Sequence, residues 1–480
     1  MNIKNPILFA VALLGYFLSM AQEMLPETEA IRKLQQDIPV LLKKSDVPGL
    51  SIALIRNGKL AWTGAFGIKD ARNNKPVNTN TVFEAASLSK PVFAYAVLKL
   101  VDEGRLNLDS PLNKYLGNNY DIVNDDRINL ITARMVLSHT TGFPNWRNEK
   151  NLPILFTPGS KFSYSGEGVV YLSRVAEKIT GLSFETFMQR YALQPLGMTA
   201  SSYIWRNRYD SIKAFRHNVL GSWAGRNQPE NGQEDSTQDH GNAAASLQTT
   251  AGDYAKLMIA LINGTGLQPL TWQQMIQPQV RTNTKYPSLA WGLGIGLETQ
   301  PNGNYCWHWG DNGDAKAFLC AFLPGKNAVV YFADGYNGLS FTKEILDDAI
   351  GGEHPSLADL GYDHYDSPNK LLVKSAAVKG AAIALQEYKQ ALKNRGDTAS
   401  EESLNDLGYL LTRMKKADDA LIIFKENTIL FPHSWNAWDS LADACMNKGD
   451  KQHAIEYYEK SLQLNPQNAH AAEKLKKLRE

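Results

Sequence analysis

Short apolar runs near both ends of a long N-terminal region have the length and composition of β-strands. Residues 49–55 and 60–67 flank Asn57-Gly58, and an Asn-Gly pair between two such runs is the strongest short signal for a β-hairpin. Four further runs of this kind lie at 290–297, 305–310, 317–322 and 328–332. We therefore expect an α+β domain in which both chain ends build one antiparallel sheet, flanked by helices and faced by a mostly helical subdomain.

The helical part is predicted from apolar or amphipathic segments between the two groups of strands and directly after them. These segments lie at 93–101, 169–179, 184–193, 253–261 and 339–350. A stretch rich in Gly, Asn and Gln, residues 221–241, predicts a long surface loop. Its Asp235, Asp239 and His240 show no metal-ligand spacing, so we expect neither a metal site nor another cofactor.

The first residues have the pattern of a secretory signal peptide. Lys4 precedes an apolar run over 7–18, which closes with the small-x-small site Ser19-Met20-Ala21. This run is shorter than the ~20 residues that a membrane span needs, and an uncleaved anchor is the alternative. We expect residues 1–21 to be removed and the protein to be secreted or periplasmic, with no membrane span after cleavage. A formal net charge of +1 implies no nucleic-acid or anionic-membrane partner.

The three cysteines, Cys306, Cys320 and Cys445, are too few for a disulfide framework. Cys306 and Cys320 lie symmetrically about Gly313 in a predicted hairpin. They either face one another in an oxidising compartment or remain separate buried thiols, and the unusual geometry of a bridge between adjacent strands favours two thiols.

Candidate chemistry is concentrated in Ser87-Leu88-Ser89-Lys90. On a helix, residues i and i+3 share a face about 5–6 Å apart at Cβ, so Lys90 can reach the Ser87 hydroxyl and take its proton. A helix start also offers free backbone N–H groups to the oxyanion that forms when a serine attacks a carbonyl. The same pattern recurs at 340–343 and 367–370, so it needs support from other residues.

Two further motifs supply that support. Tyr164-Ser165-Gly166 directly precedes an amphipathic helix, where a tyrosine can be aimed into a cleft, and His308-Trp309-Gly310 lies in a predicted strand. With Ser87-x-x-Lys90 ahead of both, this order resembles the penicillin-recognising serine hydrolases of the class C β-lactamase type. That group includes D,D-peptidases, D-amino-acid-specific peptidases and esterases. The resemblance covers about residues 30–350 and implies a serine β-lactamase/transpeptidase-like fold.

The resemblance also implies a role for each motif residue. Ser87 becomes acylated, Lys90 either deprotonates it or holds Tyr164 as a phenolate, and Tyr164 passes the proton to the leaving group. The backbone N–H groups of Ser87 and Asp311 form the oxyanion hole. The substrate, a small molecule or a peptide, lies along the strand edge formed by His308, Trp309 and Gly310.

Two residues depart from the β-lactamases of this type, which usually carry Tyr-x-Asn and Lys-Thr-Gly. Gly166 has no amide side chain, and His308 is a weaker partner than lysine for a β-lactam carboxylate. Both changes favour a peptidase or esterase acting on a D-amino peptide or a small ester. The alternatives are a class C-type β-lactamase and a non-catalytic protein that binds peptidoglycan or a partner. With a His308 pKa of ~6.5, binding or turnover of an anionic substrate should increase as pH falls.

The last third of the chain repeats itself with a period of 34 residues. Residues 404–408 align with 438–442, Ala420 with Ala454 and Pro432 with Pro466, which resembles the tetratricopeptide repeat. About three repeats are usually needed for stability, so helices near 382–392 and after Ala469 are expected to complete the packing. The module either holds a peptide or partner protein, or braces the hydrolase or mediates self-association.

The predicted domains follow from these boundaries. They are a signal peptide at 1–21, a hydrolase domain at 26–352, a helical linker at 353–402 and an all-α tetratricopeptide module at 403–480.

Overall fold

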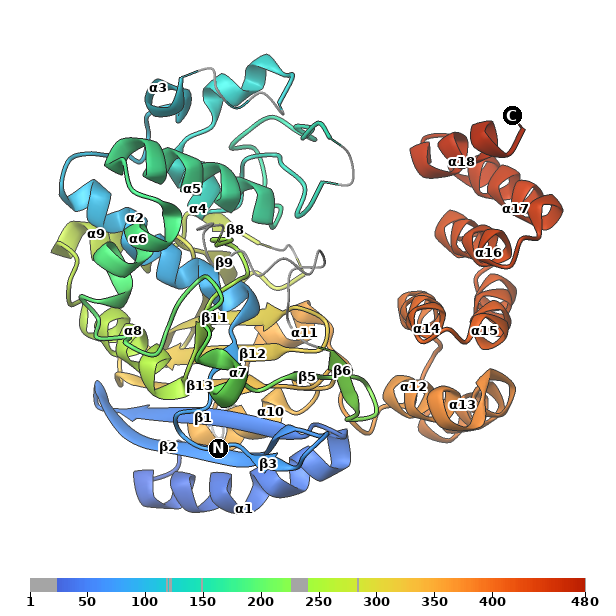
Figure 1. The fold of residues 1–480 in the computed structure, drawn as a ribbon, viewed down its shortest axis with the longest axis horizontal. Coiled ribbons are helices and arrows are strands. Elements are labelled where there is room, and N and C mark those ends of the chain that lie inside the picture. The colour runs from blue at the N-terminus through green and yellow to red at the C-terminus, as the bar shows by residue number, and fades with distance from the viewer. Residues whose placement is uncertain are drawn as a thin grey trace, which may run out of the picture. The chain divides into compact units, whose positions relative to one another are not determined.

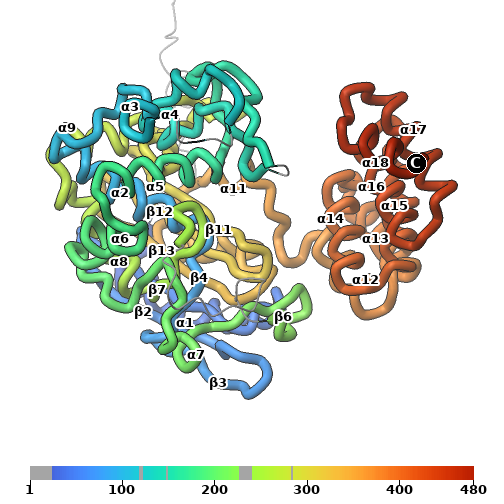
Figure 2. Tube along the Cα trace, turned by 45° about the horizontal axis from the view of Figure 1, so that its top comes forward, coloured from blue at the N-terminus to red at the C-terminus, as the bar shows by residue number. Residues whose placement is uncertain are grey.

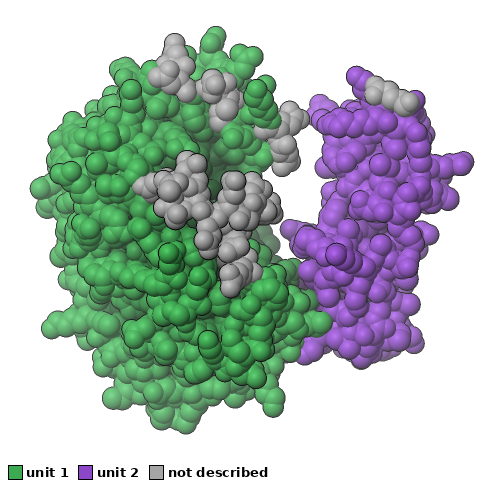
Figure 3. Space-filling view, in the orientation of Figure 1, with its two compact units in different colours: residues 1–362 green, residues 363–480 purple. Residues whose placement is uncertain are grey.

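The computed structural model describes residues 24–117, 120, 123–147, 150–225, 241–282 and 285–479. The predicted signal peptide and the loop residues Asp235, Asp239 and His240 lie outside the described residues. The chain divides into two compact units, Met1–Tyr362 and Asp363–Glu480 (Figure 3). A search of the described residues finds no helix that is long and apolar enough to cross a membrane.

Unit 1 is built on an antiparallel sheet whose strands, within the described residues, follow the order β3-β2-β1-β13-β12-β11-β10-β9-β8 (Figure 1). The strands are β1 (Gly49–Arg56), β2 (Lys59–Asp70), β3 (Lys75–Pro76), β8 (Val280–Arg281), β9 (Leu289–Trp291), β10 (Gly296–Gln300), β11 (Gly303–Asp311), β12 (Lys316–Phe322) and β13 (Asn327–Ala333). β1 pairs with β13, and the N–H of Gly49 donates to Asp334 Oδ1 at 2.7 Å. The prediction of one sheet built from both chain ends is confirmed.

Helices cover both faces of this sheet (Figure 1). α1 (Glu27–Ser45) packs with α10 (Thr342–Ala349) on one face, while α8 (Ala251–Asn263) packs against β1 and β13 on the other. The helical subdomain lies on the α8 side and contains α2 (Ser89–Asp102), α3 (Asn113–Leu116), α4 (Ala133–Leu137), α5 (Gly166–Thr180), α6 (Phe184–Met188), α9 (Pro269–Met275), a 3-10 turn (Asp126–Leu130) and a π turn (Gln189–Leu193). Short elements between the layers are β4 (Phe83–Glu84) paired with β7 (Gln248–Thr249), β5 (Arg216–His217) paired with β6 (Trp223–Gly225), and α7 (Tyr209–Ile212).

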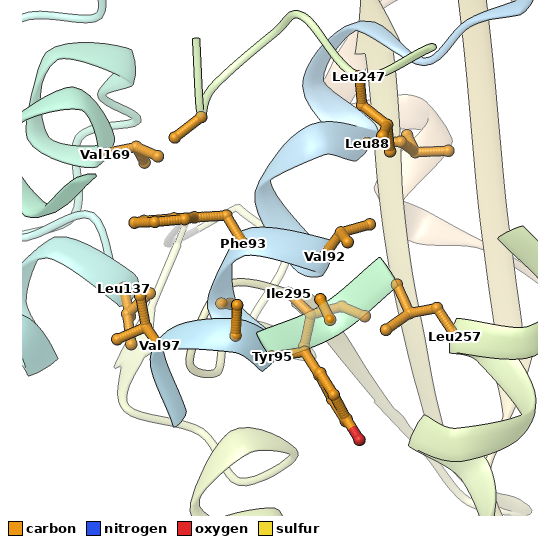
Figure 4. Packing of buried hydrophobic residues seen from close by; sticks show 14 of the residues in the cluster. Leu88, Val92, Phe93, Tyr95, Val97, Leu137, Val169, Leu247, Leu257 and Ile295 are labelled. Atoms are coloured by element: carbon orange, nitrogen blue, oxygen red, sulfur yellow. The ribbon is translucent and has the colours of Figure 1, made fainter. Parts of the chain in front are cut away.

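Helix α2 forms the centre of the core, because apolar side chains surround it on every side. Phe93 points toward α5, which bears Val169, whereas Val92 points the other way, toward Leu257 of α8 (Figure 4). Each such side chain contributes about 1.5–3 kcal/mol when buried. This packing fixes the start of α2, where the candidate nucleophile lies.

The prediction of one strand over 290–297 is wrong, because the chain turns within it. β9 ends at Trp291, and the N–H of Gly292 donates to the carbonyl of Ile295 before β10 begins. Gly294 has a φ of +81° and approaches α2 so closely that a Cβ atom would lie 2.3 Å from that of Ala94. A buried apolar turn has the same composition as a buried strand, so the sequence pattern does not separate the two.

All three cysteines fall within the described residues, where they are free and buried. In the β11–β12 register Cys306 pairs with Ala321 and Cys320 pairs with Trp307. The two thiols are therefore not opposite one another, in agreement with the expectation of two separate thiols.

Unit 2 is a series of helical hairpins (Figure 2). Its helices are α12 (Pro368–Lys379), α13 (Ala381–Arg395), α14 (Glu401–Arg413), α15 (Ala417–Leu430), α16 (Trp435–Asn447), α17 (Lys451–Leu464) and α18 (Ala469–Arg479). The segment expected as a linker supplies the pair α12–α13, which packs on α14 and α15. Small residues allow close packing, since a Cβ on Gly408 would lie 2.4 Å from the Phe424 ring. The described part of unit 2 thus holds three pairs and a final helix, the number expected for a stable array.

Candidate active site

Ser87 and Lys90 meet at the start of α2, as their spacing predicts. Ser87 lies in the 3-10 turn Ala86–Leu88, and Lys90 Nζ lies 2.9 Å from its Oγ. The same Nζ donates to the carbonyl of Ala244 at 2.9 Å. Lys90 is only 3% exposed, and this burial lowers its pKa from 10.5 to about 7. A large fraction of Lys90 is therefore a neutral amine near neutral pH and can accept a proton.

The turn that presents Ser87 is conformationally strained. Ala86 has a φ of +48°, in the left-handed region that residues with a Cβ seldom adopt. Neighbouring hydrogen bonds hold it there, because Ser89 Oγ donates to the Ala86 carbonyl at 2.6 Å and accepts from the Leu247 N–H at 3.0 Å. The Ser87 hydroxyl is thus fixed at the half-exposed tip of an otherwise buried turn.

Tyr164 lies beside this pair. Its ring centre is 4.7 Å from Lys90 Nζ and 4.8 Å from the Trp309 ring. Burial raises the pKa of Tyr164, although the nearby Ser87 hydroxyl opposes the shift. The phenol is therefore protonated at neutral pH, and its oxygen has no normal hydrogen-bond partner among the described residues.

His139 and Ser165 orient the Tyr164 loop. Ser165 caps α5 by accepting from the Gly168 N–H at 3.0 Å, and its own N–H donates to His139 Nδ1 at 3.1 Å. The His139 ring lies 4.3 Å from that of Tyr164, centre to centre. His139 therefore has a structural role in holding the Tyr164 loop.

Strand β11 reaches the turn of the candidate nucleophile, Ser87, because residue 310 is glycine. A Cβ atom on Gly310 would lie 2.5 Å from the carbonyl oxygen of Ala85 and 3.2 Å from the Cβ of Ala86. Any side chain would push the strand away from the Ser87 turn. Gly310 consequently acts as a spacer, and it brings Trp309 and Asp311 beside Ser87.

The register of the β11–β12 hairpin indicates the direction of the Asp311 N–H. The N–H of Asn312 donates to the Ala315 carbonyl at 3.1 Å, which makes these two a hydrogen-bonded pair. Such pairs alternate along an antiparallel ladder, so the N–H of Asp311, opposite Lys316, points away from β12. On that side, the described pairing of β10 with β11 ends at Trp307. The Asp311 N–H is therefore directed to the side of β11 on which the pairing with β10 has ended.

The expectation that His308 titrates near pH 6.5 at this edge is wrong. The residue is 0% exposed, and its Nδ1 lies 2.7 Å from the Trp309 carbonyl. Burial and the nearby charge of Lys90 lower its pKa to about 3. His308 is thus neutral between pH 5 and 8, and its Nε2 lacks a partner within the part of the chain that the structure describes.

The glycine that replaces the expected amide is covered by an indole. A Cβ atom on Gly166 would lie 2.5 Å from the Trp146 ring. Trp146 is 43% exposed, so it presents an aromatic surface to solvent at this end of α5. The space of an amide side chain is therefore taken by an apolar ring.

Glu84, which the sequence reading missed, ties the parts of the site together. This buried carboxylate accepts from Arg216 Nη2 at 2.5 Å and from the Asn312 side-chain amide. These donors lower its pKa despite burial. Asn312 Nδ2 also donates to the Ala245 carbonyl at 3.2 Å. A glutamate inside the apolar stretch before Ser87 was the one signal available in the sequence.

Comparisons with known proteins agree with this geometry. The Beta-lactamase family profile matches residues 30–347, and the Tetratricopeptide repeat profile matches residues 435–468. "Protein flp" of Staphylococcus aureus (strain MRSA252) is 28% identical over 210 residues, which cover 39% of this chain and 41% of that protein. "Esterase EstB" of Burkholderia gladioli is 27% identical over 192 residues, which cover 34% of this chain and 49% of the esterase. The chain therefore spans half or less of the length of these curated relatives.

A solved class C β-lactamase shares the fold of unit 1. It superposes with a TM-score of 0.58 at 19% identity, over 68% of this chain and 98% of that chain.

Proposed function

Because the chain belongs to the Beta-lactamase family of serine hydrolases, we propose that it cleaves an ester or amide through an acyl-enzyme on Ser87. The observation that supports this most directly is the 2.9 Å contact between Ser87 Oγ and a buried lysine whose pKa is about 7. A serine needs an adjacent base that is unprotonated at working pH. Lys90 meets both conditions.

Acylation begins when the neutral Lys90 amine accepts the Ser87 proton as Oγ bonds to the carbonyl carbon. The carbonyl electron pair moves to its oxygen, which accepts hydrogen bonds from the N–H groups of Ser87 and Asp311. When this intermediate collapses, the leaving oxygen or nitrogen takes the Tyr164 phenol proton, and the Lys90 ammonium reprotonates Tyr164. Water then attacks the acyl-enzyme by the same steps and releases the acid.

Lys90, not Tyr164, is the better general base on this account. Burial moves the two pKa values in opposite directions: it favours the neutral amine of Lys90 and the neutral phenol of Tyr164. A phenolate next to a neutral amine would have no charge to stabilise it. Tyr164 is therefore assigned the proton donation to the leaving group.

The proposed substrate is a small ester or a D-amino peptide. A neutral His308 offers no charge to a substrate carboxylate, and the nearby Lys316 is already paired with the Asp311 carboxylate. Trp146 replaces an amide donor with an apolar surface. The likeness to an esterase supports the same choice, whereas the class C β-lactamase fold keeps β-lactam hydrolysis as the second candidate.

The test compares the wild-type full chain with Ser87→Ala. Wild type is expected to hydrolyse p-nitrophenyl acetate and to gain the mass of one fluorophosphonate, and the variant is expected to do neither. Equal hydrolysis by both proteins would remove Ser87 as the nucleophile. No hydrolysis and no adduct in wild type would favour the non-catalytic binding protein.

A second assay ranks β-lactams against esters. Incubation with benzylpenicillin is expected to leave a slowly lost adduct on Ser87, visible by intact mass. Turnover of a chromogenic cephalosporin with a kcat approaching the ~10 s⁻¹ of ordinary enzymes would instead establish a β-lactamase.

We also propose that the protein is exported to the periplasm or secreted, on the support of the signal-peptide pattern in residues 1–21. Expression of the full sequence in a bacterial host should yield a mature chain that begins at Gln22. An exported chain that keeps its first 21 residues would support the uncleaved anchor.

For unit 2 we propose binding of a protein partner, supported by the Tetratricopeptide repeat match. The purified full chain should then be monomeric by light scattering. A dimer that dissociates on Ile429→Ser, a change at a side chain that is 70% exposed, would favour self-association instead.

A further inference from the structure

The chain does not leave unit 1 after its last sheet-covering helix. His354 Nδ1 lies 3.1 Å from Glu298 Oε2, and the N–H of Ser356 donates to Glu298 Oε1 at 2.9 Å. Glu298 belongs to β10, beside β11. Residues 351–362, the return segment, thus run back to the sheet through α11 (Pro355–Leu360) and reach the candidate active site.

The return segment ends on Asp311. The Tyr362 hydroxyl donates to Asp311 Oδ2 at 2.7 Å, and Lys316 Nζ lies 5.6 Å from the centre of the Tyr362 ring. Burial and the Asp311 carboxylate raise the pKa of the Tyr362 phenol. Tyr362, which follows the last helix of the hydrolase domain, is therefore in contact with β11, the strand whose Asp311 N–H is assigned to the oxyanion hole.

The Asp311 carboxylate has partners both inside and outside its own hairpin. It is bound by Lys316 and, at 2.8 Å, by the N–H of Gly313, which both belong to the same β11–β12 hairpin or its turn. The next residue, Asn312, ties the hairpin tip to Glu84 and to the Ala245 carbonyl, but neither of these contacts involves the Asp311 carboxylate. Tyr362 binds the same carboxylate from a separate segment of the chain.

We propose that Tyr362 is a positioning residue of the hydrolase site, which fixes the Asp311 N–H in place by binding the Asp311 carboxylate. This role rests on the proposed function, in which that N–H stabilises the oxyanion. A donor displaced from the oxyanion slows the chemical step more than it weakens substrate binding. Loss of the Tyr362 contact should therefore lower kcat more than it changes KM.

The residue after Tyr362 is held elsewhere. Asp363 begins unit 2, and its Oδ1 accepts from Asn369 Nδ2 at 3.0 Å within that unit. Two consecutive residues are thus anchored in different units, and the test is made on the full chain for this reason.

The experiment compares Tyr362→Phe with Tyr388→Phe. Tyr388 donates to Asn369 Oδ1 at 2.8 Å inside unit 2, so its variant loses a similar bond within that unit and keeps the bond between Tyr362 and Asp311. Tyr362→Phe is expected to lower kcat for p-nitrophenyl acetate about tenfold or more, with KM changed less than about twofold. Tyr388→Phe is expected to leave both constants unchanged.

A double-mutant cycle tests the route through Asp311. If Tyr362 acts by holding this carboxylate, Tyr362→Phe has no further effect on kcat in an Asp311→Ala background. Fully additive losses, or a Tyr362→Phe protein with wild-type kcat, would overturn the proposal.

Amide hydrogen exchange supplies a readout that does not depend on activity. The peptide containing Asp311 should exchange faster in Tyr362→Phe than in wild type or Tyr388→Phe. If wild type hydrolyses no ester, the proposed function fails, and the exchange result still decides whether Tyr362 positions the strand. Equal exchange in all three proteins would refute that role.

Discussion

The rate of ester hydrolysis should depend on pH through Lys90. Burial lowers its pKa from 10.5 to about 7, a difference of about 5 kcal/mol between its two protonation states. With the neutral amine as the proposed base, kcat/KM should rise tenfold per pH unit below pH 7 and become constant above about pH 8. A lysine with an ordinary pKa would be neutral in only about one molecule in 3,000 at pH 7.

The assay measures kcat/KM for an uncharged ester from pH 5 to 10 at constant ionic strength. The rising part of the pH profile below pH 7, its acidic limb, cannot come from either imidazole of the site. The pKa of His308 is about 3, and that of His139 is also well below its usual value. Lys90→Ala should lower the rate by about 10²–10⁴-fold and remove the limb. Tyr164→Phe should lower the rate and keep the limb, since it leaves the base in place.

Two results would refute this reasoning. A rate that still rises tenfold per unit up to pH 10 would mean that Lys90 keeps its ordinary pKa. A Lys90→Ala protein with the wild-type profile would mean that another group accepts the Ser87 proton.

Three further outcomes are expected. Gly310→Ala should lower kcat about 100-fold or more in a folded protein, because the methyl group would lie 2.5 Å from the Ala85 carbonyl oxygen. Ester kinetics measure the loss of kcat, and thermal unfolding shows whether the variant is folded. The folded chain binds fewer protons at Lys90 than the unfolded chain between pH 7 and 10.5, so the free energy of unfolding rises with pH across that window. Lys90→Met should therefore stabilise the protein most below pH 7. The gain is at most about 5 kcal/mol, reduced by ~1 kcal/mol for each of the two hydrogen bonds that Lys90 loses. Denaturant unfolding at pH 6 and pH 10 measures this difference. Between pH 5 and 8, KM for a substrate with a carboxylate should vary with pH in the same way in wild type and in His308→Asn. If KM varies with pH in wild type and not in His308→Asn, a His308 pKa of about 3 is contradicted.

Local patterns predicted the features that depend on neighbours in sequence. Asn57-Gly58 does connect β1 and β2, with Asn57 at a φ of +50°. Ser87 and Lys90 are in contact because three residues on a helix bring side chains together whatever surrounds them. The period of 34 likewise indicated the helix pairs of unit 2, whose contacts are mostly local.

Features that depend on distant packing were missed or misjudged. The charge state of His308 follows from its burial behind Trp309 and beside Lys90, and no local pattern reveals a burial of this kind. Glu84 contacts Arg216, which is 132 positions away, and Tyr362 contacts Asp311, which is 51 positions away. A single sequence contains no signal for such pairs beyond an unexpected charge or aromatic ring.

The pairing of β1 with β13 also affects how the protein is made. Gly49 and Asp334, which hydrogen-bond across this pair, are 285 positions apart, so β1 leaves the ribosome long before its partner exists. During that interval the exposed edge of β1 can pair with other chains, a common route to aggregation. The helix pairs of unit 2 form between neighbours in sequence and need no such wait. Unit 1, which is synthesised first, is thus the unit whose folding has to wait for contacts that are distant in sequence.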